Sequence, residues 1–205
     1  MKALLIVDVQ YDFCPGGALP VPNGDTIIPT INALIPHFDC IVQTQDWHPK
    51  NHSSFASNYE GKSPYDTIKL NYGEQVLWPD HCVQSTHGAD FHRILNKIAP
   101  HMIVRKGFRA DIDSYSAFFE NDHETATGLD GYLKERGVEE LFITGLATDF
   151  CVKWSALDAA KLGYKTTVVS DAVEGIDMDG SVGKAIKEMK EAGIHFTNSK
   201  EILNK

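Results

Sequence analysis

The chain has 205 residues, of which 42% are hydrophobic and 23% charged, which indicates a globular protein and excludes disordered, collagen-like and coiled-coil chains. Nineteen basic against 28 acidic side chains leave a net charge of −9, and no basic cluster is available to bind nucleic acid or an anionic membrane. No apolar run is long enough to span a bilayer or to act as a secretory leader. The four cysteines form no CxxC pair, so we expect free thiols in a reducing cytoplasm: Cys14, Cys40, Cys82 and Cys151.

Six short runs of aliphatic and β-branched residues predict buried strands. In chain order they cover residues 4–9, 40–44, 102–105, 141–144, 166–170 and, more weakly, 194–197. Between several of them, apolar residues spaced three and four apart predict helices, as over 28–38 and 152–162. Alternating buried strands and helices imply an α/β fold, a three-layer α/β/α arrangement around a six-stranded, mainly parallel, Rossmann-like sheet.

One long segment, residues 46–86, interrupts this alternation without a convincing helix or strand. It carries enough aromatic side chains to fold back onto the body of the protein: Trp47, Phe55, Tyr59, Tyr65, Tyr72 and Trp78. We therefore expect a lid or pocket wall there. No linker or repeat divides the chain, which predicts a single domain over residues 1–205.

Polar side chains stand at the predicted carboxyl ends of five strands, where ligands bind in open parallel sheets. These residues are Asp8, Asp46 with His48, Lys106, Cys151 after Gly145, and Asp171. Strands commonly end where water begins, so any one of these groups could be ordinary, and we expect Asp171 to be structural. Five strands presenting such groups at one rim predict a functional site.

Asp46 and His48 are two residues apart, so in an extended chain their side chains share a face and can address one ion. His81 could return to them from the long segment. Two histidines and one carboxylate suit zinc, iron or manganese and leave positions open for water or a ligand. His52 could be a fourth ligand or support the others from outside.

Cys151 follows a predicted strand and opens a helix that Thr148 or Asp149 would cap. A helix N-terminus lowers a thiol pKa, and its free amides can receive an oxyanion, although a lone cysteine can also be a plain core residue. No histidine is evidently available as its base. Asp8, held beside Lys106, could serve instead, unless those two form only a structural ion pair.

Six sequence blocks resemble, in the same order, those of the nicotinamidase family within the isochorismatase-like cysteine hydrolases. They are LLIVDVQYDFCPGGAL at 4–19, QDWHPKNHSSFA at 45–56, WPDHCVQ at 78–84, KG at 106–107, DSYSAFF at 113–119 and GLATDFCV at 145–152. The resemblance spans essentially the whole chain.

The resemblance implies roles for individual residues. It places a catalytic triad on Asp8, Lys106 and Cys151 and the metal ligands on Asp46, His48 and His81. It further implies a cis peptide between Leu146 and Ala147, with the Ala147 and Cys151 amides forming an oxyanion site. The substrate pocket would be lined by Phe13, Trp78, Tyr115 and Ala147. Phe150 stands where family members differ, so the preference among substrate analogues stays open.

The implied activity is a metal-dependent conversion of nicotinamide to nicotinate and ammonia through a thioester, in NAD salvage, with pyrazinamide as a further substrate. Four alternatives stay open: an amidohydrolase acting on a carbamoyl or ureido group, an isochorismatase, a non-haem iron oxygenase, and a non-enzymatic binding protein. The first two would share the fold, but an isochorismatase lacks the catalytic thiol, and an oxygenase would leave Cys151, Lys106 and Asp8 without a role. We expect zinc or iron, with manganese also suitable, in a monomer or homo-oligomer.

Overall fold

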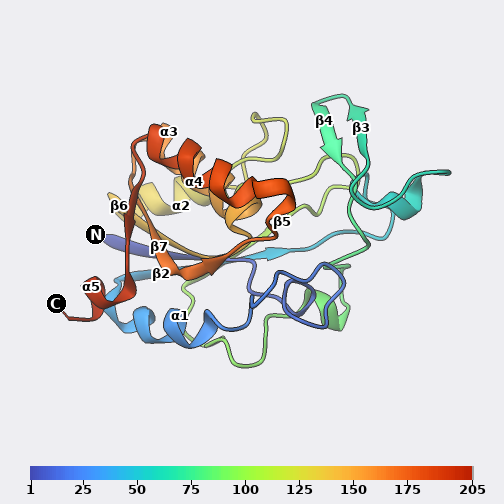
Figure 1. Ribbon diagram of the computed structural model, residues 1–205. Helices are drawn as coiled ribbons and strands as arrows, with labels where there is room; N and C mark the ends of the chain where they lie inside the picture. Colours follow the sequence, from blue (N-terminus) through green and yellow to red (C-terminus); the bar gives the residue numbers. More distant parts are fainter. Residues whose placement is uncertain (205) are drawn as a thin grey trace.

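The computed structural model describes residues 1–204 and contains a six-stranded sheet in the order β5-β2-β1-β6-β7-β8, with all neighbours parallel (Figure 1). Its strands are β1 (Lys2–Val7), β2 (Cys40–Asp46), β5 (Met102–Lys106), β6 (Glu140–Leu146), β7 (Lys165–Glu174) and β8 (His195–Thr197). The predicted mainly parallel α/β sheet is confirmed.

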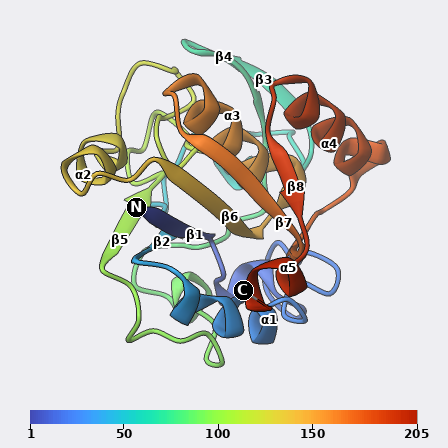
Figure 2. The same cartoon turned by 90° about the vertical axis from the view of Figure 1, so that its left-hand side faces the viewer.

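Helices cover both faces of this sheet and complete the three layers. On one face lie α2 (Leu129–Glu135), α3 (Lys153–Lys161) and α4 (Ser181–Glu191); on the other lie α1 (Ile28–Leu34) and α5 (Ser199–Leu203), which contact each other (Figure 2). Successive side chains of β1 point to opposite faces of the sheet. Leu5 packs with the first set of helices, and Leu4 and Ile6 pack with α1. No helix among the described residues has the length and apolar character needed to cross a membrane.

The segment 46–86 differs from the expectation because it contains an antiparallel hairpin, β3 (Thr67–Leu70) and β4 (Gly73–Val76), which stands apart from the main sheet in Figure 1. Each of its strands has only four residues and most of them are at least partly exposed, so neither produces an apolar run. Within residues 1–204, six short helices of the 3₁₀ or π type accompany these elements: η1 (Tyr11–Phe13), η2 (Ile35–His37), η3 (Ala56–Asn58), η4 (His87–Ala89), η5 (Thr148–Val152) and η6 (Met178–Gly180).

Asp171 does not end a strand, and the prediction that it does is wrong. β7 continues past it to Glu174, with an irregularity in its pairing to β6 between Ile143 and Gly145. The Asp171 carboxylate instead accepts hydrogen bonds from the Ser199 amide at 2.7 Å and the Ser199 hydroxyl at 2.5 Å. These bonds attach the start of α5 to the sheet, which is a structural use of the carboxylate.

Candidate active site

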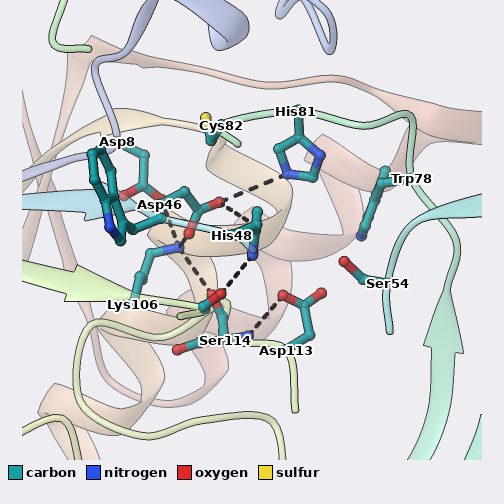
Figure 3. A network of polar contacts seen from close by, with 12 residues as sticks. Asp8, Asp46, His48, Ser54, Trp78, His81, Cys82, Lys106, Asp113 and Ser114 are labelled. Atoms are coloured by element: carbon teal, nitrogen blue, oxygen red, sulfur yellow. Dashed lines mark hydrogen bonds and ion pairs between the residues drawn. The ribbon is translucent and has the colours of Figure 1, made fainter. Parts of the chain in front are cut away.

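The ends of β1, β2 and β5 bring three charged side chains together at the rim of the sheet (Figure 3). Lys106 Nζ lies 2.8 Å from Asp8 Oδ2, forms an ion pair with Asp46 and donates to the Ser114 carbonyl at 2.9 Å. Cys151 Sγ lies 3.4 Å from the same ammonium. The structure therefore brings the predicted triad together, with Asp8 and Cys151 both next to the buried Lys106.

The strand register accounts for this meeting point. Asp46 and Lys106 are direct partners in the β2–β5 pair, so their side chains emerge side by side. Asp8 follows β1 in a left-handed conformation with φ of 49°. Thr44 holds it there, because the Thr44 hydroxyl accepts from the Asp8 amide at 3.1 Å and donates to Asp8 Oδ1 at 2.5 Å. Thr44 was not among the predicted site residues, although its position two residues before Asp46 places it on the same face of the strand.

The electrostatics of the cluster keep the lysine charged. Burial acts against the charge of Lys106, but Asp46 and Asp8 hold its pKa well above the ordinary value. Burial raises the pKa of Asp8 to about 6, against the pull of Lys106. Burial also acts to raise the pKa of Asp46, yet Lys106 and then His48 lower it below its usual range. One ammonium thus stabilises two carboxylates of unequal basicity.

Cys151 lies in the π-helical turn η5, directly before α3. The prediction that Thr148 or Asp149 caps this helix is wrong, because no side chain caps either η5 or α3. The Asp149 carboxylate accepts instead from the amides of Ile176 and Asp177 and from the hydroxyl of Ser181. It therefore attaches the segment after β7 to the turn that carries the cysteine, a role that its place in GLATDFCV did not reveal.

The expectation of a lowered thiol pKa is also wrong. Burial raises the pKa of Cys151 well above its ordinary value, and Lys106 opposes that shift without reversing it. The loss of water at this buried sulfur outweighs the attraction of Lys106 for a thiolate. The resting thiol is therefore protonated, and any reaction at sulfur needs a base within reach, which is where Asp8 lies.

Asp46 also faces two histidines through its second oxygen. Asp46 Oδ2 lies 3.4 Å from His48 Nε2 and 3.8 Å from His81 Nε2. The Nδ1 atoms of these histidines contact backbone carbonyls, those of Gly107 and Pro79, each at 2.8 Å. A carbonyl oxygen only accepts, so in the neutral rings these contacts favour the proton on Nδ1 and direct Nε2 toward Asp46. The three residues could hold a metal ion, because their ligand atoms lie within 4.8 Å of one another.

His52 belongs to a different set. Its ligand atom groups with those of His48 and Asp113 rather than with those of Asp46 and His81. His52 Nδ1 contacts the Ser54 hydroxyl at 2.7 Å, and Nε2 lies 3.3 Å from the Ile112 carbonyl. Its ring centroid is 4.2 Å from that of His48. These contacts place His52 beside Asp46, His48 and His81, which we call the metal-type set, with its ring packed against that of His48.

One pocket opens over the thiol and over Asp46 and His81, two of the three residues that could hold a metal ion. Its lining comprises Phe13, Leu19, Asp46, Trp78, His81, Asp113, Tyr115, Ala147, Phe150, Cys151 and Ile176. Trp78 and Phe150 meet edge to face with centroids 4.9 Å apart, and Tyr115 lies 5.7 Å from Phe150. The peptide between Leu146 and Ala147 is cis. Leu19, Asp113 and Ile176 were not among the predicted lining residues; Asp113 stands in the DSYSAFF block, which was its only signal.

Comparison with known proteins agrees with this geometry. The family model described as "Isochorismatase domain" matches residues 2–201. A curated nicotinamidase of Acinetobacter baylyi is 56% identical over 201 residues, covering 98% of this chain and 94% of the relative. The solved structure titled as an Acinetobacter baumanii nicotinamidase and pyrazinamidase superposes with a TM-score of 0.96 at 56% identity, covering 98% of this chain and 97% of that one.

A second solved structure adds a metal. The Pyrococcus horikoshii pyrazinamidase in complex with zinc is 40% identical, with a TM-score of 0.78, and covers 96% of this chain and 98% of its own. The resemblance seen in the six sequence blocks is thereby confirmed at the level of the family. The chain belongs to the isochorismatase domain family.

Proposed function

We propose that this protein is a nicotinamidase, which hydrolyses nicotinamide to nicotinate and ammonia. The observation that carries the proposal is the shared pocket, in which a thiol beside a buried Asp8–Lys106 pair opens onto the same aromatic-walled space as Asp46 and His81, two members of the aspartate and two-histidine set. The 56% identity to a curated nicotinamidase over nearly the full chain supports the same activity. One domain spanning residues 1–205 would contain the whole machinery.

Asp8 is the base that prepares the nucleophile. Because the resting Cys151 thiol is protonated, the Asp8 carboxylate accepts its proton as the sulfur adds to the carboxamide carbon. Lys106 keeps Asp8 ionised beforehand and stabilises the thiolate as it forms, 3.4 Å from the sulfur. This division of work explains why a single ammonium contacts both groups.

The oxyanion that forms on the carbonyl oxygen would be held by the backbone amides of Ala147 and Cys151. Such donors contribute about 3 kcal/mol each in acyl-transfer enzymes. Asp8 then returns the proton to the leaving nitrogen, so that ammonia departs and a thioester to Cys151 remains. Water, activated by the same carboxylate, hydrolyses the thioester to nicotinate and restores the thiol.

Asp46, His48 and His81 would hold one divalent ion, for which zinc, iron and manganese all suit the ligand set. When bound, such an ion supplies a Lewis acid that orients and polarises the heteroaromatic ring. Zinc in the P. horikoshii pyrazinamidase supports this assignment. The Nδ1 contacts of His48 and His81 with backbone carbonyls orient both rings, so that their Nε2 atoms are available to the ion.

Phe13, Trp78 and Tyr115 wall the space where a flat pyridine ring would lie, and Phe150 closes the wall beside Trp78. Pyrazinamide has nearly the same shape, so we propose it as a second substrate. The reaction would serve NAD salvage in the cytoplasm, where four free cysteines persist.

Ammonia release from nicotinamide, followed in a coupled assay with the purified protein, tests the proposal. Turnover of nicotinamide in preference to carbamoyl and ureido compounds is the expected result. Turnover of a ureido compound with nicotinamide untouched would assign the same triad to a different amidohydrolase.

A further inference from the structure

The β3–β4 hairpin carries one buried polar side chain, that of Gln75, which is 1% exposed. Its neighbours Glu74 and Val76 are exposed and half-buried, and no residue of the hairpin lines the substrate pocket. A buried amide needs hydrogen-bond partners, because leaving its groups without water or partner costs free energy. Two partners of Gln75, Asp113 and Tyr115, lie outside the hairpin and line the pocket.

The orientation of the Gln75 amide follows from those partners. Nε2 lies 2.9 Å from Asp113 Oδ2 and 2.7 Å from the Val76 carbonyl oxygen, and both oxygens accept. On the other side, Oε1 accepts from the Tyr72 hydroxyl at 3.0 Å. The amide nitrogen is therefore directed at Asp113 and at whatever stands beside it.

Tyr115 stands beside it, with its hydroxyl oxygen 3.1 Å from Gln75 Nε2. The same oxygen lies 3.2 Å from Trp78 Nε1, and an indole nitrogen only donates. Gln75 Nε2 faces three oxygens with two hydrogens, so one of these hydrogens is shared between Asp113 Oδ2 and the Tyr115 hydroxyl oxygen. Tyr115 therefore accepts from Trp78 and from this shared hydrogen, and its own hydrogen must point elsewhere. Among residues 1–204 the Tyr115 hydroxyl donates no hydrogen bond, and its side chain lines the pocket.

We propose that Gln75 is a positioning residue that, together with Trp78, turns the Tyr115 hydroxyl into a hydrogen-bond donor facing the pocket. The ligand class is a flat heteroaromatic amide that presents an acceptor atom to this wall. The hairpin then sets substrate affinity through Tyr115 without touching the substrate. The inference rests on the proposed function, since it concerns the substrate of that same pocket.

A double-mutant cycle tests the route through Tyr115. Gln75→Met keeps the volume and removes the hydrogen bonds, Tyr115→Phe removes the hydroxyl, and the double variant combines them. Glu74→Gln, one residue away and exposed, is the matched control. For each variant, kcat and KM for nicotinamide are measured, together with the Kd of nicotinamide in a Cys151→Ala background.

We expect Gln75→Met to raise KM and Kd by about five- to thirtyfold with kcat changed less than about threefold. Tyr115→Phe should match it, and adding Gln75→Met to Tyr115→Phe should change Kd less than about twofold further. Glu74→Gln should leave all constants unchanged.

If the change in Kd of the double variant equals the product of the two single changes, Gln75 acts by a route other than Tyr115, and the inference is overturned. A fall in kcat at constant Kd would overturn it as well. If Gln75→Met does not fold, an unchanged Kd for Tyr115→Phe alone has the same consequence. Wild-type protein that releases no ammonia would refute the proposed function instead, while the Kd cycle would still decide the role of Gln75.

Discussion

The strand-end cluster and the pocket wall are built in different ways. Asp46 and Lys106 are placed by the register of the β2–β5 pair, Asp8 directly follows the neighbouring strand β1, and all three are buried. The wall residues Trp78 and Tyr115 come from loops with no shared period and are held by side-chain hydrogen bonds. Backbone pairing of the sheet thus brings the charged groups of the cluster together, whereas side-chain contacts shape the space around the substrate. Substitutions in the cluster should therefore remove chemistry or stability, and those in the wall should mainly change affinity.

The largest effect is expected for Cys151→Ala, which removes the nucleophile from the cluster. We expect kcat for nicotinamide to fall by at least about 10⁴-fold, because no other group can form the thioester. The fold should persist, since the change removes one sulfur atom. Ammonia release checks the rate and circular dichroism checks the fold; substantial residual turnover would eliminate the covalent step.

Lys106→Met should come next, because it leaves two buried carboxylates without their shared cation. Breaking one partner out of a buried ion pair costs about 3–5 kcal/mol of unfolding free energy, and activity should be lost with it. Urea denaturation measures the stability. The control is Lys165→Met, whose ion pair to Glu140 is exposed and should be worth less than about 1 kcal/mol. Equal losses of unfolding free energy for Lys106→Met and Lys165→Met would contradict the expected difference between a buried and an exposed ion pair.

His81→Ala should remove one ligand of the metal-type set while the triad stays in place. We expect bound metal to be lost and kcat/KM to fall by at least about 100-fold. Metal content is measured by elemental analysis beside activity, and His37→Ala, an exposed histidine, serves as control. Full activity of a metal-free His81→Ala protein would mean that the cluster works without an ion.

Acidification should titrate the base of the cluster. The pKa of Asp8 is about 6, raised by burial against the pull of Lys106, and only its ionised form accepts the thiol proton. Below about pH 6, kcat/KM should therefore fall about tenfold per pH unit. A pH profile of kcat/KM checks this. A flat profile down to pH 4.5 would mean that Asp8 is not the base.

The smallest effect is expected for Asp149→Asn, which weakens the attachment of the segment after β7 to η5, the turn that carries Cys151. The Asn amide group cannot accept at both ends, so at least one of three donors loses its partner. We expect a loss of about 1–3 kcal/mol in unfolding free energy. Asp90→Asn, on an exposed side chain, should change it by less than about 0.5 kcal/mol. Equal stabilities would show that the attachment contributes nothing.

The strand-end cluster could be predicted from the sequence more fully than the pocket wall. The strands and their terminal residues could be predicted from apolar runs, because burial between two helical layers demands continuous hydrophobic residues. Asp171 was misplaced because β7 stays in the sheet beyond its apolar run. The hairpin was missed because four-residue strands that are mostly exposed carry no pattern. Gln75 carried no signal and Asp113 only its place in the DSYSAFF block, since a buried amide or carboxylate looks like a surface one until its partners are known.

By itself, the sequence determined the family, the parallel α/β sheet and the residues that stand at its rim. These properties depend on local periodicity and on motifs read along the chain. Only the tertiary structure decided that one lysine serves two carboxylates, that the thiol is protonated at rest and that Tyr115 accepts from two donors. The physical reason is that charge, proton affinity and hydrogen-bond direction depend on which groups meet away from water, and residues far apart in sequence supply those groups.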